Sequence, residues 1–177
     1  SSTHTNIKRP SEVFLIMCIL VHMTHDLTEE EMKEVLATQV LGHLACCIDD
    51  RPYLVPMAFA YKSGILYGQT VDGRKTQVLR SNPHCCFHVG DTKGRVWRSV
   101  LCEGEFEELD FRSLDKKESI DAVKYLSDRL ATVQDVVGVD VPIDIEGMPV
   151  PLTIDGKKAT LFRIVITQMT GKGTKSK

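Results

Sequence analysis

The sequence predicts a mainly β fold of the α+β class, an antiparallel barrel with a few flanking helices. Short apolar runs recur along the chain and are separated by turn signals, such as Asp-Asp-Arg-Pro at 49–52 and Lys-Ser-Gly at 62–64. Few segments show helical periodicity, whereas a doubly wound parallel sheet would need a helix after nearly every strand. Consecutive hairpins therefore favour an antiparallel barrel.

Length and charge fit one folded domain and argue against a protein that binds nucleic acid by neutralising phosphates. The chain has 177 residues, of which 42% are hydrophobic and 26% are charged. Lys and Arg number 22 against 24 Asp and Glu, so the formal net charge is −2. This balance gives no long-range positive field.

Residues 1–23 are predicted to be a leader or extension of uncertain structure, followed by the domain at 24–172 and a basic tail at 173–177. The apolar run at 13–21 follows a basic pair, but it is far shorter than the roughly 20 residues that span a bilayer. The residues after this run are not the small ones that mark signal-peptide cleavage. We therefore expect no membrane segment and a cytoplasmic protein.

The cysteines occur as two adjacent pairs and two single residues, with no CxxC spacing. Neighbouring residues on a strand point to opposite faces, so an adjacent pair on a regular strand cannot supply two ligands to one metal ion. Buried, reduced thiols are the simpler interpretation and agree with a cytoplasmic location. The cysteines are Cys18, Cys46, Cys47, Cys85, Cys86 and Cys102.

The first predicted helix begins at a capping box, in which Thr28 and Glu31 can each bond the backbone amide of the other. Helical periodicity extends this helix over residues 29–38. The face that it turns toward the core consists of Met32, Val35 and Leu36.

Three strands are predicted next, at residues 40–48, 53–61 and 65–70, with a turn between each pair. The second strand contains Pro56, which removes one donor from the backbone hydrogen-bond ladder. We therefore expect this strand to lie at a sheet edge, or to carry a bulge where something other than a neighbouring strand approaches.

The rest of the chain alternates between strands and two helices. A short helix at 74–80 ends before Ser-Asn-Pro, and apolar residues at helical spacing predict a longer helix over 114–133. Three prolines make residues 139–155 a predicted loop. The remaining strands are expected at 85–89, 97–109 and 159–169.

The turn between the strand ending at Thr70 and the helix beginning at Arg74 is the first candidate site. Free amides at the helix N-terminus, the Thr70 hydroxyl and the cations of Arg74 and Lys75 would together suit a phosphate dianion. A surface turn with two solvated cations is the alternative interpretation. The segment is neither a Walker loop nor a GxGxxG motif.

Two further patterns have both a functional and a structural interpretation. Trp97 and Ser99 share one face of a predicted strand, which suits an aromatic wall beside a hydroxyl, although a single Trp is more often a core or interface anchor. His84, Cys86 and His88 would also share a face, which suits a metal or haem iron but equally a barrel strand with polar ends. No catalytic triad, HExxH motif or activated cysteine is apparent in the sequence.

The order of these motifs resembles the flavin-binding split-barrel family related to pyridoxamine 5′-phosphate oxidase, in particular its nitroimidazole-resistance-like branch. The resemblance extends from about Leu27 to Lys172 and depends on joint order and spacing rather than on one motif. Its parts are Pro-Tyr-Leu-Val-Pro at 52–56, Leu-Tyr-Gly-Gln-Thr at 66–70, Asp-Gly-Arg-Lys at 72–75, Ser-Asn-Pro at 81–83, Trp-Arg-Ser-Val at 97–100, Gly-Glu-Phe-Glu-Glu-Leu at 104–109, Phe-Arg-Ile at 162–164 and Thr-Gly-Lys at 170–172.

The resemblance implies a homodimer of split β-barrels with FMN at the subunit interface. Thr70, Arg74 and Lys75 would hold the phosphate, and residues 57–59 would lie along the isoalloxazine ring and offer it backbone groups. Some of the other pocket residues would come from the second subunit. The cofactor-binding residues implied by position are Met57, Ala58, Phe59, Gln69, Thr70, Arg74, Lys75, Trp97, Arg98 and Ser99.

The implied function is FMN-dependent oxidoreduction of a small-molecule substrate, in which the flavin transfers hydride or electrons. No side chain is clearly required as an acid or base, so we name no catalytic residue. The chain lacks the carboxy-terminal arginine motif of true pyridoxamine 5′-phosphate oxidases, which argues against that particular reaction. The alternatives are a non-catalytic module that binds flavin or haem on the same barrel, and a structural homodimer without a cofactor.

Overall fold

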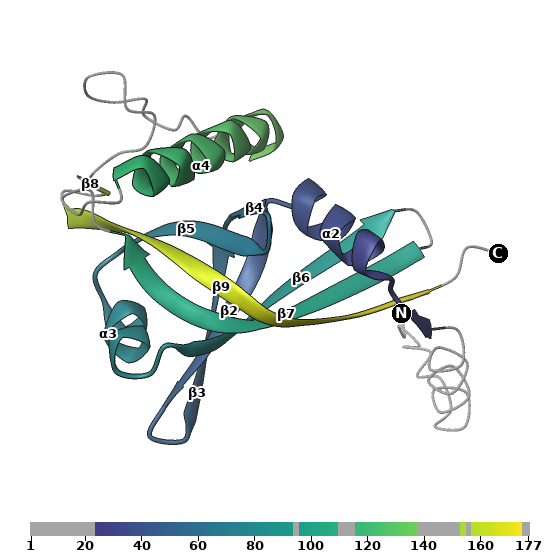
Figure 1. Cartoon of the computed structure of the whole chain (residues 1–177), viewed down its shortest axis with the longest axis horizontal. Coiled ribbons are helices and arrows are strands. Elements are labelled where there is room, and N and C mark those ends of the chain that lie inside the picture. Colours follow the sequence, from purple (N-terminus) through teal and green to yellow (C-terminus); the bar gives the residue numbers. More distant parts are fainter. Residues whose placement is uncertain (1–23, 94–95, 110–115, 138–152, 155–156, 175–177) are drawn as a thin grey trace, which may run out of the picture.

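The computed structural model describes residues 24–93, 96–109, 116–137, 153–154 and 157–174. Within these ranges an antiparallel sheet curls into a barrel, and three helices pack around it (Figure 1). The predicted leader and residues 139–152 and 155 of the predicted proline-rich loop lie outside the described residues.

The sheet confirms the predicted fold class, a mainly β, antiparallel split barrel with flanking helices. Seven strands follow one another in the order β3-β2-β6-β7-β9-β5-β4, and β1 and β8 pair with β9 outside this path. Every pair is antiparallel. The strands are β1 (Thr24–Asp26), β2 (Leu41–Ile48), β3 (Arg51–Ala58), β4 (Ala60–Lys62), β5 (Ile65–Val71), β6 (His84–Lys93), β7 (Val96–Leu109), β8 (Thr153–Ile154) and β9 (Lys157–Thr174).

The helices are α2 (Glu29–Thr38), α3 (Arg74–Ser81) and α4 (Lys116–Val137), close to the predicted ranges. The predicted capping box opens α2: the Thr28 hydroxyl accepts from the Glu31 amide at 3.3 Å, and the Glu31 carboxylate accepts from the Thr28 amide at 2.8 Å. Helix α4 lies over β4 and β5, and α3 lies beside β2 (Figure 1).

The predicted strand at 53–61 is wrong as a single element, because the chain changes sheet partner at Phe59. Strand β3 pairs with β2, whereas β4 pairs with β5 at the other end of the strand order. Between them the Phe59 amide donates to the carbonyl of Val40 at 3.1 Å, and its buried ring packs edge-on against Phe87. Phe59 thereby joins the two edges of the sheet and closes the barrel. Strand β3, which contains Pro56, is an edge strand as predicted.

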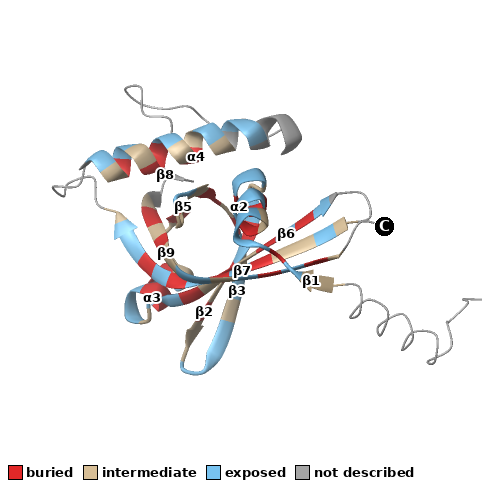
Figure 2. Cartoon of the chain, turned by 45° about the vertical axis from the view of Figure 1, so that its right-hand side comes forward, coloured by how far each residue is buried: buried red, intermediate tan, exposed pale blue. Residues whose placement is uncertain are grey.

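The core fills the inside of the barrel, and Figure 2 shows buried residues at intervals along its strands. Aromatic rings meet at its centre, with the Phe106 and Phe162 centroids 5.1 Å apart. A smaller apolar cluster lies between α4 and the sheet. Its buried members are Ala60, Tyr67, Ala122, Val123, Leu126 and Leu161.

Strand β9 is longer at both ends than the strand predicted at 159–169, and it continues through Gly173 and Thr174. Its end pairs with β7 and with β1, so partners elsewhere in the chain extend it beyond its apolar run. Gly171 is required by close packing, because a Cβ there would lie 2.8 Å from Met32 Cγ on α2. At the other end, Thr153 and Ile154 of the predicted loop form β8 because they pair with the start of β9.

Candidate functional site

The predicted phosphate-binding turn lies where β5 ends and α3 begins. Gly73 is the N-cap residue of α3 and has no side-chain cap hydrogen bond. The buried Thr76 hydroxyl instead bonds to Gly73, accepting from its amide at 3.0 Å and donating to its carbonyl at 2.8 Å. The first-turn amides of α3 are therefore not occupied by a capping side chain, and the positive end of the helix dipole faces the turn.

Arg74 and Lys75 extend from this first turn without a carboxylate partner among the described residues. The Arg74 guanidinium lies over the Tyr53 ring, with its carbon 5.2 Å from the ring centroid. Lys75 is half-buried, and burial lowers the pKa of its ammonium group. In the same helix Arg80 is paired with two carboxylates, those of Asp72 and Glu108, both at 2.6 Å. The two unpaired cations beside uncapped amides fit an anionic ligand.

Thr70 and Gln69 lie on neighbouring positions of β5 and point to opposite sides of the strand. Thr70 is buried, and its hydroxyl donates to the Val71 carbonyl at 3.3 Å. Gln69 is half-buried and pairs in register with Leu161 of β9. Both residues precede the cations by a few positions in one continuous segment, although their contact with a ligand remains a prediction.

Met57 and Ala58 end the edge strand β3, and Phe59 follows directly after it. The side chains of Met57 and Phe59 are buried in the core, whereas Ala58 is only partly buried. Because β3 is an edge strand, one side of its backbone has no sheet partner. The segment can therefore offer backbone groups and a small side chain to a flat ligand, which is the role predicted for it.

The segment at 97–99 lies far from the two cations of α3 within one chain (Figure 1). The two cations lie near Cys46 on β2. Burial raises the pKa of the Cys46 thiol, and the positive charges of Lys75 and Arg74 offset part of this rise. Cys46 pairs in register with Cys85, and Trp97 pairs with Thr92, which is seven residues further along β6 (92 − 85). At 3.3 Å per residue this separation is roughly 23 Å. One chain does not bring the two groups together.

Arg98 occupies an ion-pair network that sequence reasoning did not find. Its guanidinium donates to the Asp91 carboxylate at 2.5 and 3.1 Å and to the Glu34 carboxylate at 2.8 Å. The side chains of Arg98 and Asp91 are only 12% and 5% exposed. Gln39 also donates to Asp91, at 3.1 Å. The network joins the C-terminal half of α2 to the β6–β7 hairpin, so a contact between Arg98 and a ligand remains a prediction.

Ser99 and Trp97 are on the outer face of the sheet. The Ser99 hydroxyl and His88 Nε2 are 2.9 Å apart, and the His88 ring centroid lies 6.0 Å from that of His43 on β2. Trp97 is exposed, and its amide donates to the Thr174 hydroxyl at 2.9 Å.

The same outer face carries the exposed apolar side chains of the sheet. His43 pairs with His88, His88 with Leu101, and Ala45 with Leu54, so these positions share a face. Leu41 lies two residues from His43 on β2, and Trp97 lies four residues from Leu101 on β7. Both therefore share this face, because side chains alternate along a strand. Four large apolar side chains on this face are between 38% and 62% exposed: Leu41, Leu54, Trp97 and Leu101. A face of this kind is typical of an interface.

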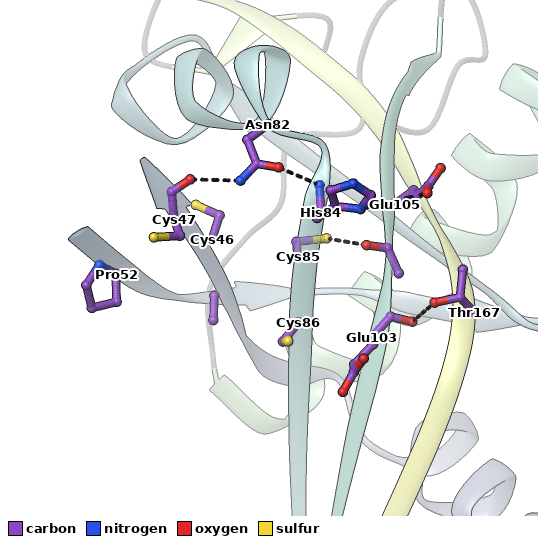
Figure 3. A pocket seen from close by; sticks show the side chains of 12 residues that line it. Cys46, Cys47, Pro52, Asn82, His84, Cys85, Cys86, Glu103, Glu105 and Thr167 are labelled. Atoms are coloured by element: carbon purple, nitrogen blue, oxygen red, sulfur yellow. Dashed lines mark hydrogen bonds and ion pairs between the residues drawn. The ribbon is translucent and has the colours of Figure 1, made fainter. Parts of the chain in front are cut away.

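Two pairs of cysteines line an open pocket of about 530 Å³ beside α3, between β2, β6 and β7 (Figure 3). The Cys85 thiol lies 3.6 Å from the Gly104 carbonyl, and burial raises its pKa to about 12, as it does for Cys102. All five described cysteines are free. Within the described part of the chain no three His, Cys, Asp or Glu side chains are arranged to hold a metal ion. The pocket could not be predicted because it depends on the register of strands far apart in sequence.

The fold and this site define a split-barrel protein with an anion-binding turn at a helix N-terminus. Residues 28–142 match the family described as pyridoxamine 5′-phosphate oxidase, and the chain belongs to this family. The predicted resemblance is therefore confirmed.

Known relatives agree with this assignment. An uncharacterized protein of Rhizobium meliloti is 37% identical over 84 residues, which are 47% of this chain and 56% of that protein. The structure of an FAD-binding protein of Mesorhizobium loti is similar with a TM-score of 0.65 and 28% identity, over 86% of this chain and 99% of that chain. A proposed 5-nitroimidazole antibiotic resistance protein of Bacteroides thetaiotaomicron shares the fold, with a TM-score of 0.62, 16% identity and coverage of 85% and 87%.

Across the residues that the structure describes, none of the helices has both the length and the apolar character needed to cross a bilayer.

Proposed function

We propose that this chain binds a flavin nucleotide, FMN, at the interface of a homodimer and uses it for oxidation and reduction of a small-molecule substrate. The observation that carries the proposal is the turn before α3, where Arg74 and Lys75 have no carboxylate partner among the described residues and the first-turn amides are uncapped. In a member of this family, a flavin phosphate is the anion that this turn fits best.

The chain's own residues would bind and orient the cofactor. Arg74 and Lys75 would form charge-assisted bonds with the phosphate, and its negative charge would offset the cost of burying the Lys75 cation. The backbone of residues 57–59, where the edge strand β3 ends, would hold the flat ring system. The flavin, when bound, supplies hydride or electron transfer, and the protein supplies position and electrostatics.

A homodimer would complete the site. The segment at 97–99 and the α3 cations are on the order of 20 Å apart along the sheet of one chain, so they cannot both contact the same end of one flavin. A second copy packed on the apolar outer face would supply its own segment at 97–99 to the first copy's flavin. The exposed leucines and Trp97 on that face support this arrangement.

FMN and FAD share the ring system and the first phosphate, so the anion site by itself is compatible with both. The Mesorhizobium loti relative is described as FAD-binding, which makes FAD the competing cofactor for this chain. FMN is the better match because its phosphate monoester is a dianion, which suits two unpaired cations, whereas each phosphate of FAD carries a single charge. A cytoplasmic location belongs to the same proposal and is supported by the five free thiols.

The visible spectrum of the purified protein tests the proposal first. We expect flavin absorbance, and identification of the released chromophore distinguishes FMN from FAD and from haem. Anaerobic addition of NADH or NADPH then separates a redox enzyme from a module that only binds flavin. A colourless protein that takes up neither added FMN nor added FAD would contradict the proposal.

Lys75→Ala tests the phosphate site directly. The variant loses charge-assisted bonds worth about 1.5–3 kcal/mol each, so FMN should bind about ten- to a hundredfold more weakly in a fluorescence titration. Lys33→Ala is the matched control, because Lys33 lies on α2 in an exposed ion pair with Glu29. FMN affinity that is unchanged in Lys75→Ala would place the phosphate elsewhere.

A further inference from the structure

The N-terminus of α3 carries only one half of a capping box. In the complete motif, the third helical residue bonds the amide of the cap residue, and the cap side chain bonds the amide of the third residue. In α3 the Thr76 side chain makes the first of these bonds, to the Gly73 amide at 3.0 Å. The second is missing because Gly73 has no side chain. The bond that would compete with an anion for the helix amides is therefore the one that is absent.

Helix α2 of the same chain shows the opposite arrangement. Its capping box is complete, with both bonds between Thr28 and Glu31 present. Its first turn contains three acidic residues, whereas the first turn of α3 contains none and carries two cations. Helix α2 thus supplies its own cap and counter-charge, and α3 leaves both to a ligand.

Gly73 is required neither by backbone strain nor by lack of space. Its φ of 179° is extended backbone that any residue adopts. A Cβ at this position would meet nothing within 4 Å. A serine would therefore fit, and its hydroxyl could accept a hydrogen bond from the Thr76 amide, as N-cap side chains do. The glycine instead leaves that amide open.

The Thr76 side chain fixes the shape of the turn from its buried side. Its side chain is fully buried, so it does not face a ligand in solvent. Its hydroxyl makes two bonds with the same residue, since it also donates to the Gly73 carbonyl at 2.8 Å. The orientation of the Gly73 peptide groups is thereby set by the chain itself before any ligand arrives.

We propose that Thr76 is a positioning residue for the flavin phosphate, and that Gly73 keeps the first-turn amides of α3 open to it. The inference rests on the proposed flavin function and deepens it by giving roles to two residues that are not among the cofactor-binding residues implied by the resemblance. Both residues belong to the turn at the N-terminus of α3, so we expect them to act on the phosphate and not on the ring system.

Parallel titrations with FMN and with riboflavin, which lacks the phosphate, test this inference. Thr76→Val removes the hydroxyl at nearly constant volume and should weaken FMN binding about tenfold while leaving riboflavin affinity unchanged. Thr76→Ser restores the hydroxyl and should bind FMN within about threefold of the natural chain. Thr38→Val is the control, because the Thr38 hydroxyl bonds the Glu34 carbonyl on α2 at 2.8 Å. Riboflavin should bind all of these variants equally.

Gly73→Ser provides an independent arm that does not disturb the buried hydroxyl. Because the substitution completes the cap, the unfolding temperature should stay the same or rise. The affinity for FMN should nevertheless fall about tenfold, and the affinity for riboflavin should not change. Wild-type FMN affinity in this variant, or equal losses of FMN and riboflavin in Thr76→Val, would overturn the inference. If the natural chain binds neither ligand, the proposed function itself fails.

Discussion

Two hairpin tips place non-glycine residues in the left-handed region, and they differ at the second position of the turn. Asp49 and Asp50 join β2 to β3 with φ of 49° and 57°, and Ser63 and Gly64 join β4 to β5 with φ of 50° and 83°. A two-residue hairpin turn of this kind favours glycine at its second position. A side chain in the left-handed region costs roughly 1–2 kcal/mol. At its second position the β2–β3 turn therefore carries strain that the β4–β5 turn avoids.

Asp50→Gly should raise the free energy of unfolding by about 0.5–1 kcal/mol, because relief of the strain exceeds the extra entropy of the unfolded glycine. Urea denaturation measures this change. Gly64→Ala is the reciprocal variant and should lower stability by a similar amount, since its Cβ would meet nothing within 4 Å and packing cannot contribute. A less stable Asp50→Gly protein would show that the aspartates hold the turn by other means.

Local chemistry decided what could be predicted for single residues. The capping box of Thr28 and Glu31 was correct because both partners lie within one helical turn. The partners of Arg98 were not predictable, because Glu34 is 64 positions away in the sequence and only the fold brings it close. The unpaired cations at 74–75 were predictable as a pair, but the lack of a carboxylate beside them is a property of the folded chain.

At the scale of elements, the buried network of Arg98 and Asp91 attaches α2 to the end of the β6–β7 hairpin. Asp91→Ala leaves Arg98 with one carboxylate and Gln39 without its acceptor, in a site where the charges are shielded from water. We expect the free energy of unfolding to fall by about 2–3 kcal/mol in denaturant titrations.

The control for this variant is Asp26→Ala, which removes an exposed partner of Lys172 and should cost less than about 1 kcal/mol. Equal effects of the two substitutions would mean that the network contributes no more than a surface ion pair.

Element boundaries were predicted well where periodicity carried the signal and poorly where tertiary pairing did. Residues 53–61 form one continuous apolar run, and nothing local shows that the chain changes partner at Phe59. The glycines of 170–174 weaken a strand pattern, yet β9 continues through them because β1 and β7 supply partners. Pro56 predicted that β3 is either an edge strand or a strand with a bulge, and β3 lies at the edge of the sheet.

For the whole molecule, the apolar outer face predicts a homodimer. Leu101→Asp places a charge in the middle of this face and should shift the protein from about twice 19.8 kDa to a monomer in sedimentation velocity. Ile120→Asp is the matched control, because Ile120 is also exposed but lies on α4. If Ile120→Asp dissociates the dimer and Leu101→Asp does not, the interface is formed by the face of the molecule that carries α4.

The family and the architecture could be predicted from the joint order of short motifs, because each motif marks a strand end or a turn in the same topology. The separation of 97–99 from the cations could not be predicted. It depends on the register along β6 and β7, where one end of the hairpin lies near α3 and the other near α2. Strand patterns show which residues share a face, but not which face points outward.

Strand β9 has a consequence for how the chain acquires its structure. It is the partner of β1, β5, β7 and β8, and its register with β1 joins residues about 150 positions apart. During synthesis, residues 24–109 can form only the β3-β2-β6-β7 sheet and the β4–β5 hairpin, because the strand that bridges them has not yet left the ribosome. Pairings this distant in sequence are slow, so the apolar interior stays accessible to chaperones until the final strand arrives.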